Sequence, residues 1–182
     1  MKKLSIAAAL ALAFAAPGAS AADQISTKLT GWEENPSIST PASGTFSATI
    51  SNDDSEISYE LTFANLLGTV TQAHIHISRP GVNGGISAWL CGTLPNTPGP
   101  AGTPPCPVLP AGEVATVTGT ITAAQVVGPV TQQILAGELA ELIAAIRAGA
   151  AYANVHSTVA PGGEMRGQIG ANGNSAAASH NH

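Results

Sequence analysis

Charged side chains are scarce in this chain of 182 residues, in which Asp, Glu, Lys and Arg together account for 9% of the positions. Only six residues are Lys or Arg, against eleven that are Asp or Glu. With so little positive charge there is no basic stripe to neutralise a phosphate backbone, which excludes nucleic-acid binding by counterion release. Gly, Ala, Ser, Thr and Pro are abundant instead, a composition common in exported β-proteins.

Long apolar runs are missing except near the N-terminus, where the run Leu4 to Ala16 is too short to span a bilayer as a helix. Two lysines precede this run and the small residues Ala19-Ser20-Ala21 follow it, which is typical of a secretory signal peptide. We therefore predict a signal peptide over residues 1–21 and a periplasmic or extracellular location. The next part, residues 22–170, has the length of one domain and no membrane span.

Familiar catalytic motifs are also missing. The sequence has no G-x-S-x-G nucleophile elbow, no H-E-x-x-H motif, no P-loop and no EF-hand calcium loop. Its few carboxylates do not form a pair of the kind used in glycoside hydrolysis. We therefore expect a binding or structural protein more than an enzyme.

The chain has only two cysteines, Cys91 and Cys106, separated by a Pro-rich segment with little structure of its own. In an oxidising compartment such a pair most simply forms a disulfide. In the chain-entropy model, closing a loop of this size stabilises the fold by roughly 3 kcal/mol. The alternative is a pair of copper-binding thiols, against which the predicted export counts.

Alternation of polar and apolar residues runs through most of the chain and predicts short β-strands. They cover residues 25–29, 44–50, 56–64, 69–78, 86–90, 114–121, 151–159 and 164–169. From Ala136 to Ala148 the apolar residues instead recur at helical spacing, and Gly149 is placed to end one short amphipathic helix. We expect a mainly β fold, an antiparallel β-sandwich of immunoglobulin-like or Greek-key type. Residues 171–182 are predicted to form a disordered tail, which contains His180 and His182.

The other three histidines lie on the polar faces of two predicted strands. His74 and His76 share a face of one strand, and His156 shares a face of a later strand with Tyr152 and Asn154. Two residues apart on a strand, side chains start about 7 Å apart, so both imidazoles of the first strand can reach one ion. A third imidazole from a neighbouring strand would complete a nitrogen site that suits copper. If the strands are not adjacent, these are surface histidines without a metal.

A second polar set lies on the last predicted strand, where Glu164, Arg166 and Gln168 share a face. In one interpretation Glu164 and Arg166 form an ion pair or brace a turn. In the other, Arg166 draws a small anion toward the histidines. Glu164, Arg166, Tyr152 and Asn154 are thus the candidates for support of the metal ligands or for anion steering. Trp32 and Trp89 are expected to be packing residues.

Several segments of the sequence resemble the chordin-type (CHRD) domain of secreted and bacterial extracytoplasmic proteins. They occur in order across roughly residues 25–170 and read Leu29-Thr30-Gly31-Trp32-Glu33-Glu34-Asn35-Pro36, Ala73-His74-Ile75-His76, Gly81-Val82-Asn83-Gly84, Tyr152-Ala153-Asn154-Val155-His156-Ser157 and Gly163-Glu164-Met165-Arg166-Gly167-Gln168-Ile169. The resemblance implies an immunoglobulin-like β-sandwich and an exported location. Ser157 departs from the family pattern, in which Thr is usual, and the Pro-rich insertion between the cysteines is particular to this chain.

The His-x-His strand and the later His strand are also similar to the copper side of copper–zinc superoxide dismutase, another β-sandwich. The zinc-binding loop and a fourth copper histidine of that enzyme have no counterpart in this sequence. Our leading hypothesis is an exported domain that binds a copper ion, or a similar transition-metal ion, through His74, His76 and His156 without turnover. The alternatives are a structural or adhesive module without metal, and a dismutase-like redox enzyme. The sequence identifies no protein partner.

Overall fold

The computed structural model describes residues 22–93, 95, 98–108, 110 and 113–170. The predicted signal peptide, residues 1–21, and the predicted tail, residues 171–182, lie outside the described residues. In the described part of the chain, none of the helices has the length and apolar character needed to cross a membrane.

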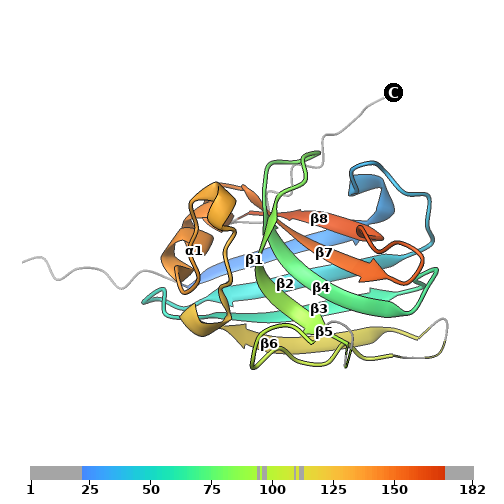
Figure 1. The fold of residues 1–182 in the computed structure, drawn as a ribbon, viewed down its shortest axis with the longest axis horizontal. Coiled ribbons are helices and arrows are strands. Elements are labelled where there is room, and N and C mark those ends of the chain that lie inside the picture. The colour runs from blue at the N-terminus through green and yellow to red at the C-terminus, as the bar shows by residue number, and fades with distance from the viewer. Residues whose placement is uncertain (1–21, 94, 96–97, 109, 111–112, 171–182) are drawn as a thin grey trace, which may run out of the picture.

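Eight antiparallel strands dominate the domain (Figure 1). They are β1 (Asp23–Thr30), β2 (Ser43–Ile50), β3 (Ile57–Ala64), β4 (Val70–Ile77), β5 (Gly85–Gly92), β6 (Ala115–Ile121), β7 (Ala151–Ser157) and β8 (Met165–Ile169). Every strand predicted from the polar–apolar alternation is present, with ends within two residues of the prediction. The alternation therefore separates the core face of each strand from its outer face, although in β7 the residues of both faces are buried.

The strands form one continuous sheet in the order β5-β4-β7-β8-β1-β2-β3-β6. This sheet curves until its two edge strands approach each other, so that it is nearly closed into a barrel (Figure 1). Ala88 of β5 forms a bridge with Val126, just beyond β6, and the Tyr59 hydroxyl of β3 donates to the Leu90 carbonyl of β5 at 2.7 Å. The prediction of a mainly β, antiparallel fold with one short helix is confirmed.

The hydrophobic core fills the interior of this curved sheet. Aliphatic and aromatic side chains from strands on all sides meet there, and Leu29, Phe46, Leu61, Ile75 and Val155 are each buried to 99% or more. Full burial of such a side chain stabilises the fold by roughly 1.5–3 kcal/mol. Because Ile75 and Val155 point inward, their neighbours on β4 and β7 point to the outer face of the sheet.

The one α-helix of the described residues, α1, spans Leu139–Arg147 and has its predicted apolar face buried. It begins three residues later than predicted because Gly137 adopts a φ of 90° and the Glu138 side chain accepts a hydrogen bond from the Leu135 N–H at 2.6 Å. Gly149 has a φ of 67° and ends the helix as expected. Three short 3-10 helices, η1 (Gly31–Glu33), η2 (Ala123–Gln125) and η3 (Val130–Gln132), lie in the connections.

The predicted disulfide between Cys91 and Cys106 is present. It joins the end of β5 to the segment after the Pro-rich insertion, and the Cys106 N–H donates to the Gly92 carbonyl at 2.9 Å beside it. Both sulfur atoms are bonded to each other, so this form of the protein offers no thiol pair for copper.

Candidate metal centre

The two histidine-bearing strands, β4 and β7, are direct neighbours in the sheet. In their antiparallel register Gln72 is opposite His156, and Asn154 is opposite His74. His156 is therefore diagonal to His74, a position from which ring side chains can reach each other on one face of a sheet. The two strands are therefore adjacent, as a metal site built from both of them requires.

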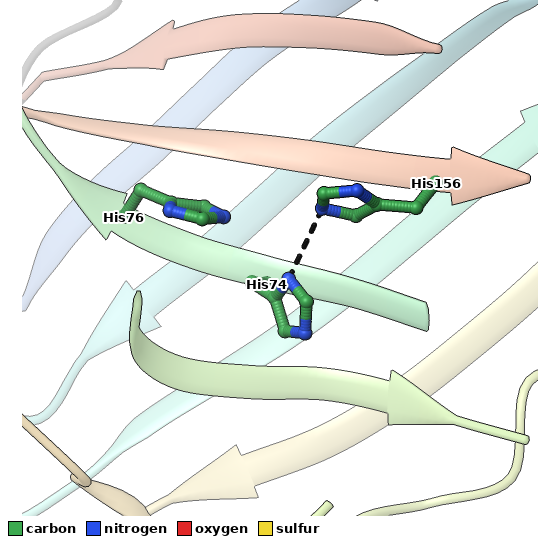
Figure 2. A group of neighbouring side chains, drawn as sticks. All are labelled: His74, His76 and His156. Carbon is green, nitrogen blue, oxygen red and sulfur yellow. Dashed lines mark hydrogen bonds between the residues drawn. The ribbon is translucent and has the colours of Figure 1, made fainter. Parts of the chain in front are cut away.

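All three imidazole rings gather on the outer face of β4 and β7 (Figure 2). Nδ1 of His74 is 3.1 Å from Nε2 of His156, and the His76 ring points toward the same space. One nitrogen from each ring can be chosen so that all three lie within 4.8 Å of one another. The rings thus form a compact group that could hold a metal ion.

Backbone carbonyls fix which nitrogens of the group are free. Nδ1 of His76 is 3.0 Å from the Gly84 carbonyl, and Nδ1 of His156 is 3.0 Å from the Pro161 carbonyl. A carbonyl only accepts, so both Nδ1 atoms carry the proton and both Nε2 atoms present lone pairs. Nε2 of His76 is buried without a hydrogen-bond partner. Such lone pairs, oriented through the other ring nitrogen, are the usual ligands of protein-bound transition metals.

Burial keeps the three rings neutral. His74 is fully buried, and His76 and His156 are 8% and 6% exposed. Burial lowers the pKa of His74 to about 2, with the other two rings as lesser causes. It lowers the pKa of His76 to about 4, and it also lowers the pKa of His156. Neutral imidazole is the form that coordinates a metal, so at neutral pH the ligands need lose no proton from a charged state.

A column of stacked side chains supports His76. Its ring lies parallel to the Tyr152 ring, with 4.8 Å between the centroids and 5° between the planes. On Tyr152 lies the guanidinium of Arg166, 3.4 Å from the ring centroid. The Tyr152 hydroxyl oxygen accepts a hydrogen bond from the Gly84 N–H at 3.2 Å, next to the carbonyl that His76 contacts. The column and the loop before β5 together hold the His76 ring in place.

Arg166 is directed at that loop as well as at Tyr152. The guanidinium donates to the Val82 carbonyl at 2.9 Å and to the Arg79 carbonyl at 3.0 Å, and the residue is 1% exposed. These are contacts of a brace that fixes the loop, one of the two roles considered for Arg166. Its buried charge also acts on His76, where it is a minor cause of the lowered pKa.

Glu164 lies at the centre of a different set of contacts. Its fully buried carboxylate accepts hydrogen bonds from the Thr40 hydroxyl and from the Leu67 N–H, both at 2.7 Å, and from the Ser157 hydroxyl. Two of these donors, Thr40 and Leu67, lie in connections of the barrel, and the third, Ser157, is the last residue of β7. Glu164 thus joins two loops to the end of β7 and makes none of the ion pairs identified in the described part of the chain.

Glu34 is a buried acidic residue near the centre that the sequence analysis did not single out. Its carboxylate accepts a hydrogen bond from the Asn154 amide, which also donates to the Met165 carbonyl at 3.0 Å. Burial raises the pKa of Glu34 to about 7, although Asn154 and the charge of Arg166 oppose the rise. A Cβ at position 163 would lie 2.8 Å from Glu34 and from Asn154, so only a glycine at this position lets the backbone pass so close to the two side chains. The only sequence signal is the motif around Trp32, in which Glu34 is one of two adjacent acids.

The two tryptophans differ in their surroundings. Trp89 of β5 packs edge-to-face against His74, with 4.3 Å between the ring centroids. Trp32 is 68% exposed, which makes it a surface residue in place of the expected packing residue. His180 and His182 lie outside the described residues.

Comparison with known proteins identifies the family. The family profile of the CHRD domain matches residues 25–169, which is most of the chain. The protein therefore belongs to the CHRD domain family, as its motifs suggested. Neither the curated proteins nor the solved structures contain a match, so no relationship to superoxide dismutase is shown.

Proposed function

We propose that this protein is exported and binds one copper ion through Nδ1 of His74 and the Nε2 atoms of His76 and His156. The observation that carries the proposal is the 3.1 Å separation of the His74 and His156 nitrogens within a buried group of neutral rings. Imidazole nitrogens lie about 2.0–2.1 Å from a bound Zn²⁺ ion, and copper is of similar size, so two ligands of one ion are roughly 3–3.5 Å apart. The separation fits two ligands of one such ion.

The ligand types support copper. In the described part of the chain the group contains three imidazoles and no carboxylate or thiolate. Magnesium and calcium prefer oxygen ligands, whereas imidazole suits copper, zinc, nickel and iron. Among divalent ions of the first transition row, copper binds a given nitrogen site most tightly.

Burial of the ligands supports a protein that holds the ion over one that turns over a substrate on it. Turnover at a metal needs an open coordination position. His74 is fully buried and the other two ligands are more than 90% buried, which leaves little room for an incoming molecule. An exported protein of this kind would bind copper outside the cytoplasm, before the ion enters the cell interior.

The test is a copper titration of the chain without residues 1–21, followed by elemental analysis after desalting. We expect one copper per chain, and loss of that copper in His74→Ala and in His156→Gln. The double variant His180→Ala/His182→Ala removes two imidazoles that are not among the three proposed ligands and serves as the matched control, because it should keep the stoichiometric ion. Retention of copper by His74→Ala and His156→Gln, with folding checked by circular dichroism, would exclude this site. Failure of the unaltered chain to bind copper would favour the module without metal.

A further inference from the structure

The coordination sphere and the charges around the three histidines distinguish between oxidation states of a bound ion. Taking the proposed copper site as the premise, we infer that the protein binds cuprous copper, Cu⁺, in preference to Cu²⁺ and to Zn²⁺. Two independent features, ligand burial and the local balance of charge, carry this inference.

The first feature is the number of ligands that the site can offer. Zn²⁺ with three protein imidazoles takes water as a fourth ligand, and Cu²⁺ favours four or more ligands in a tetragonal arrangement. Nε2 of His76 is buried from solvent and His74 has no exposed surface. The Trp89 ring covers one side of His74, and the Tyr152 ring lies parallel to His76. Cu⁺ is satisfied by two or three nitrogens, so it needs no water in this enclosed space.

The second feature is the lack of negative charge in the ligand set. The three ligands are imidazole nitrogens and include no carboxylate or thiolate, so the ion keeps its full charge when it is buried. The cost of transferring an ion out of water grows with the square of its charge, which makes it about four times larger for a divalent ion than for a monovalent one. Neutral ligands in a buried site therefore favour the lower charge.

The nearest charged groups strengthen this preference. The guanidinium of Arg166 lies 3.4 Å from the centroid of the Tyr152 ring, and that ring is stacked on His76. Two buried acids contact residues of β7, where Glu34 accepts from Asn154 and Glu164 accepts from Ser157, and neither of these contacts is with a histidine. Burial raises the pKa of Glu34 to about 7, so at neutral pH it supplies only part of a negative charge. Arg166 thus outweighs Glu34 around the ion.

The experiment compares the affinities of the two copper states for the chain without residues 1–21. Cu⁺ is titrated anaerobically in competition with bicinchoninate, with ascorbate as a reductant that does not exchange with the disulfide; Cu²⁺ is titrated in competition with nitrilotriacetate. We expect the dissociation constant for Cu⁺ to be roughly hundredfold lower than that for Cu²⁺. The reduction potential of the bound copper is then about 118 mV higher than in a site that binds the two states equally. Equal or tighter His74-dependent binding of Cu²⁺ or Zn²⁺ would overturn the inference and leave the copper site intact. Failure of every ion to bind would instead overturn the proposed function.

Two matched variants test the role of charge separately from that of folding. Arg166→Met removes the positive charge, whereas Arg166→Lys keeps it, and both lose the planar contacts to the loop. The preference for Cu⁺ should narrow in Arg166→Met and persist in Arg166→Lys. Glu34→Gln keeps an acceptor for Asn154 and should widen the preference. If neither Arg166→Met nor Glu34→Gln changes the ratio of the two constants, the electrostatic part of the inference is wrong.

Discussion

His74 and His156, separated by 82 positions in the sequence, bring Nδ1 and Nε2 to within 3.1 Å of each other. Without a cation a proton must lie between them, and it has to come from His74, because the proton of His156 is directed at the Pro161 carbonyl. Nε2 of His74 and Nε2 of His76 then both stay buried and unpaired, which costs about 1–3 kcal/mol for each. The metal-free centre is therefore organised but not satisfied, and an ion that binds there should stabilise the whole domain.

Copper should raise the thermal stability of the protein. An ion that binds only the folded state adds about 4.1 kcal/mol when its free concentration is a thousandfold above the dissociation constant. For a domain of this size that corresponds to a rise in Tm of roughly 8–16 °C. Differential scanning calorimetry with and without copper measures the shift. The same shift in His76→Gln would show that copper stabilises the protein from another place.

Acid should destabilise the metal-free protein. The folded pKa values of the three histidines lie below the unfolded value of 6.5, because burial disfavours the charged rings. Their contribution to the free energy of unfolding is present above pH 6.5. It is lost as the pH falls, since the unfolded chain then binds protons that the folded chain does not bind. Each histidine contributes up to about 1.4 kcal/mol per pH unit in this range. Urea unfolding between pH 7 and pH 5 measures the net loss.

Glu34 should oppose this trend. Its folded pKa of about 7 is above the unfolded value of 4.5, so its contribution is present at acidic pH and is lost as the pH rises through 7. Three histidines outweigh one carboxyl, so the net effect of acid is still destabilising. In Glu34→Gln the opposing contribution is gone, and stability should fall more steeply from pH 7 to pH 5. An unchanged or shallower slope would contradict the assignment of a raised pKa to Glu34.

Much of the centre could be predicted from the sequence because side chains alternate along a strand. The pattern placed the histidines on polar faces and identified the buried residues of α1. It could not show that β4 and β7 are neighbours, because alternation determines which face a residue occupies but not which strand lies beside it. Glu34 was missed because it lies in a connection, where no periodicity marks burial. The start of α1 was predicted too early because the spacing of apolar residues does not show that the backbone at Gly137 leaves the helical conformation, with a φ of 90°.

Loss of Arg166 should loosen the loop that orients His76. Arg166→Met removes the contacts to Val82, Arg79 and Tyr152, which should cost roughly 2–4 kcal/mol in urea unfolding. Arg166→Lys should recover little of this, because an ammonium does not reproduce the planar fork. Hydrogen exchange should accelerate at residues 78–84 and not in α1.

Arg147→Met provides the matched control for that measurement. Arg147 pairs with Asp23 and Asp54 at 2.7 Å, but its side chain is 39% exposed. Exposed ion pairs contribute about 0–1 kcal/mol, so its loss should cost much less than that of Arg166. Equal costs at the two positions would show that the buried brace is not special.

Removal of the disulfide should weaken the fold without removing the metal site. The bond between Cys91 and Cys106 closes a loop of 15 residues, and the double variant Cys91→Ser/Cys106→Ser should lose roughly 3 kcal/mol. Copper should still bind stoichiometrically, because the ligands lie on β4 and β7 and the pairing of these strands does not depend on the cysteines. Urea unfolding and elemental analysis of the same preparation measure both effects. Loss of copper from a folded double variant would mean that sulfur takes part in binding, and would contradict a site made of imidazole alone.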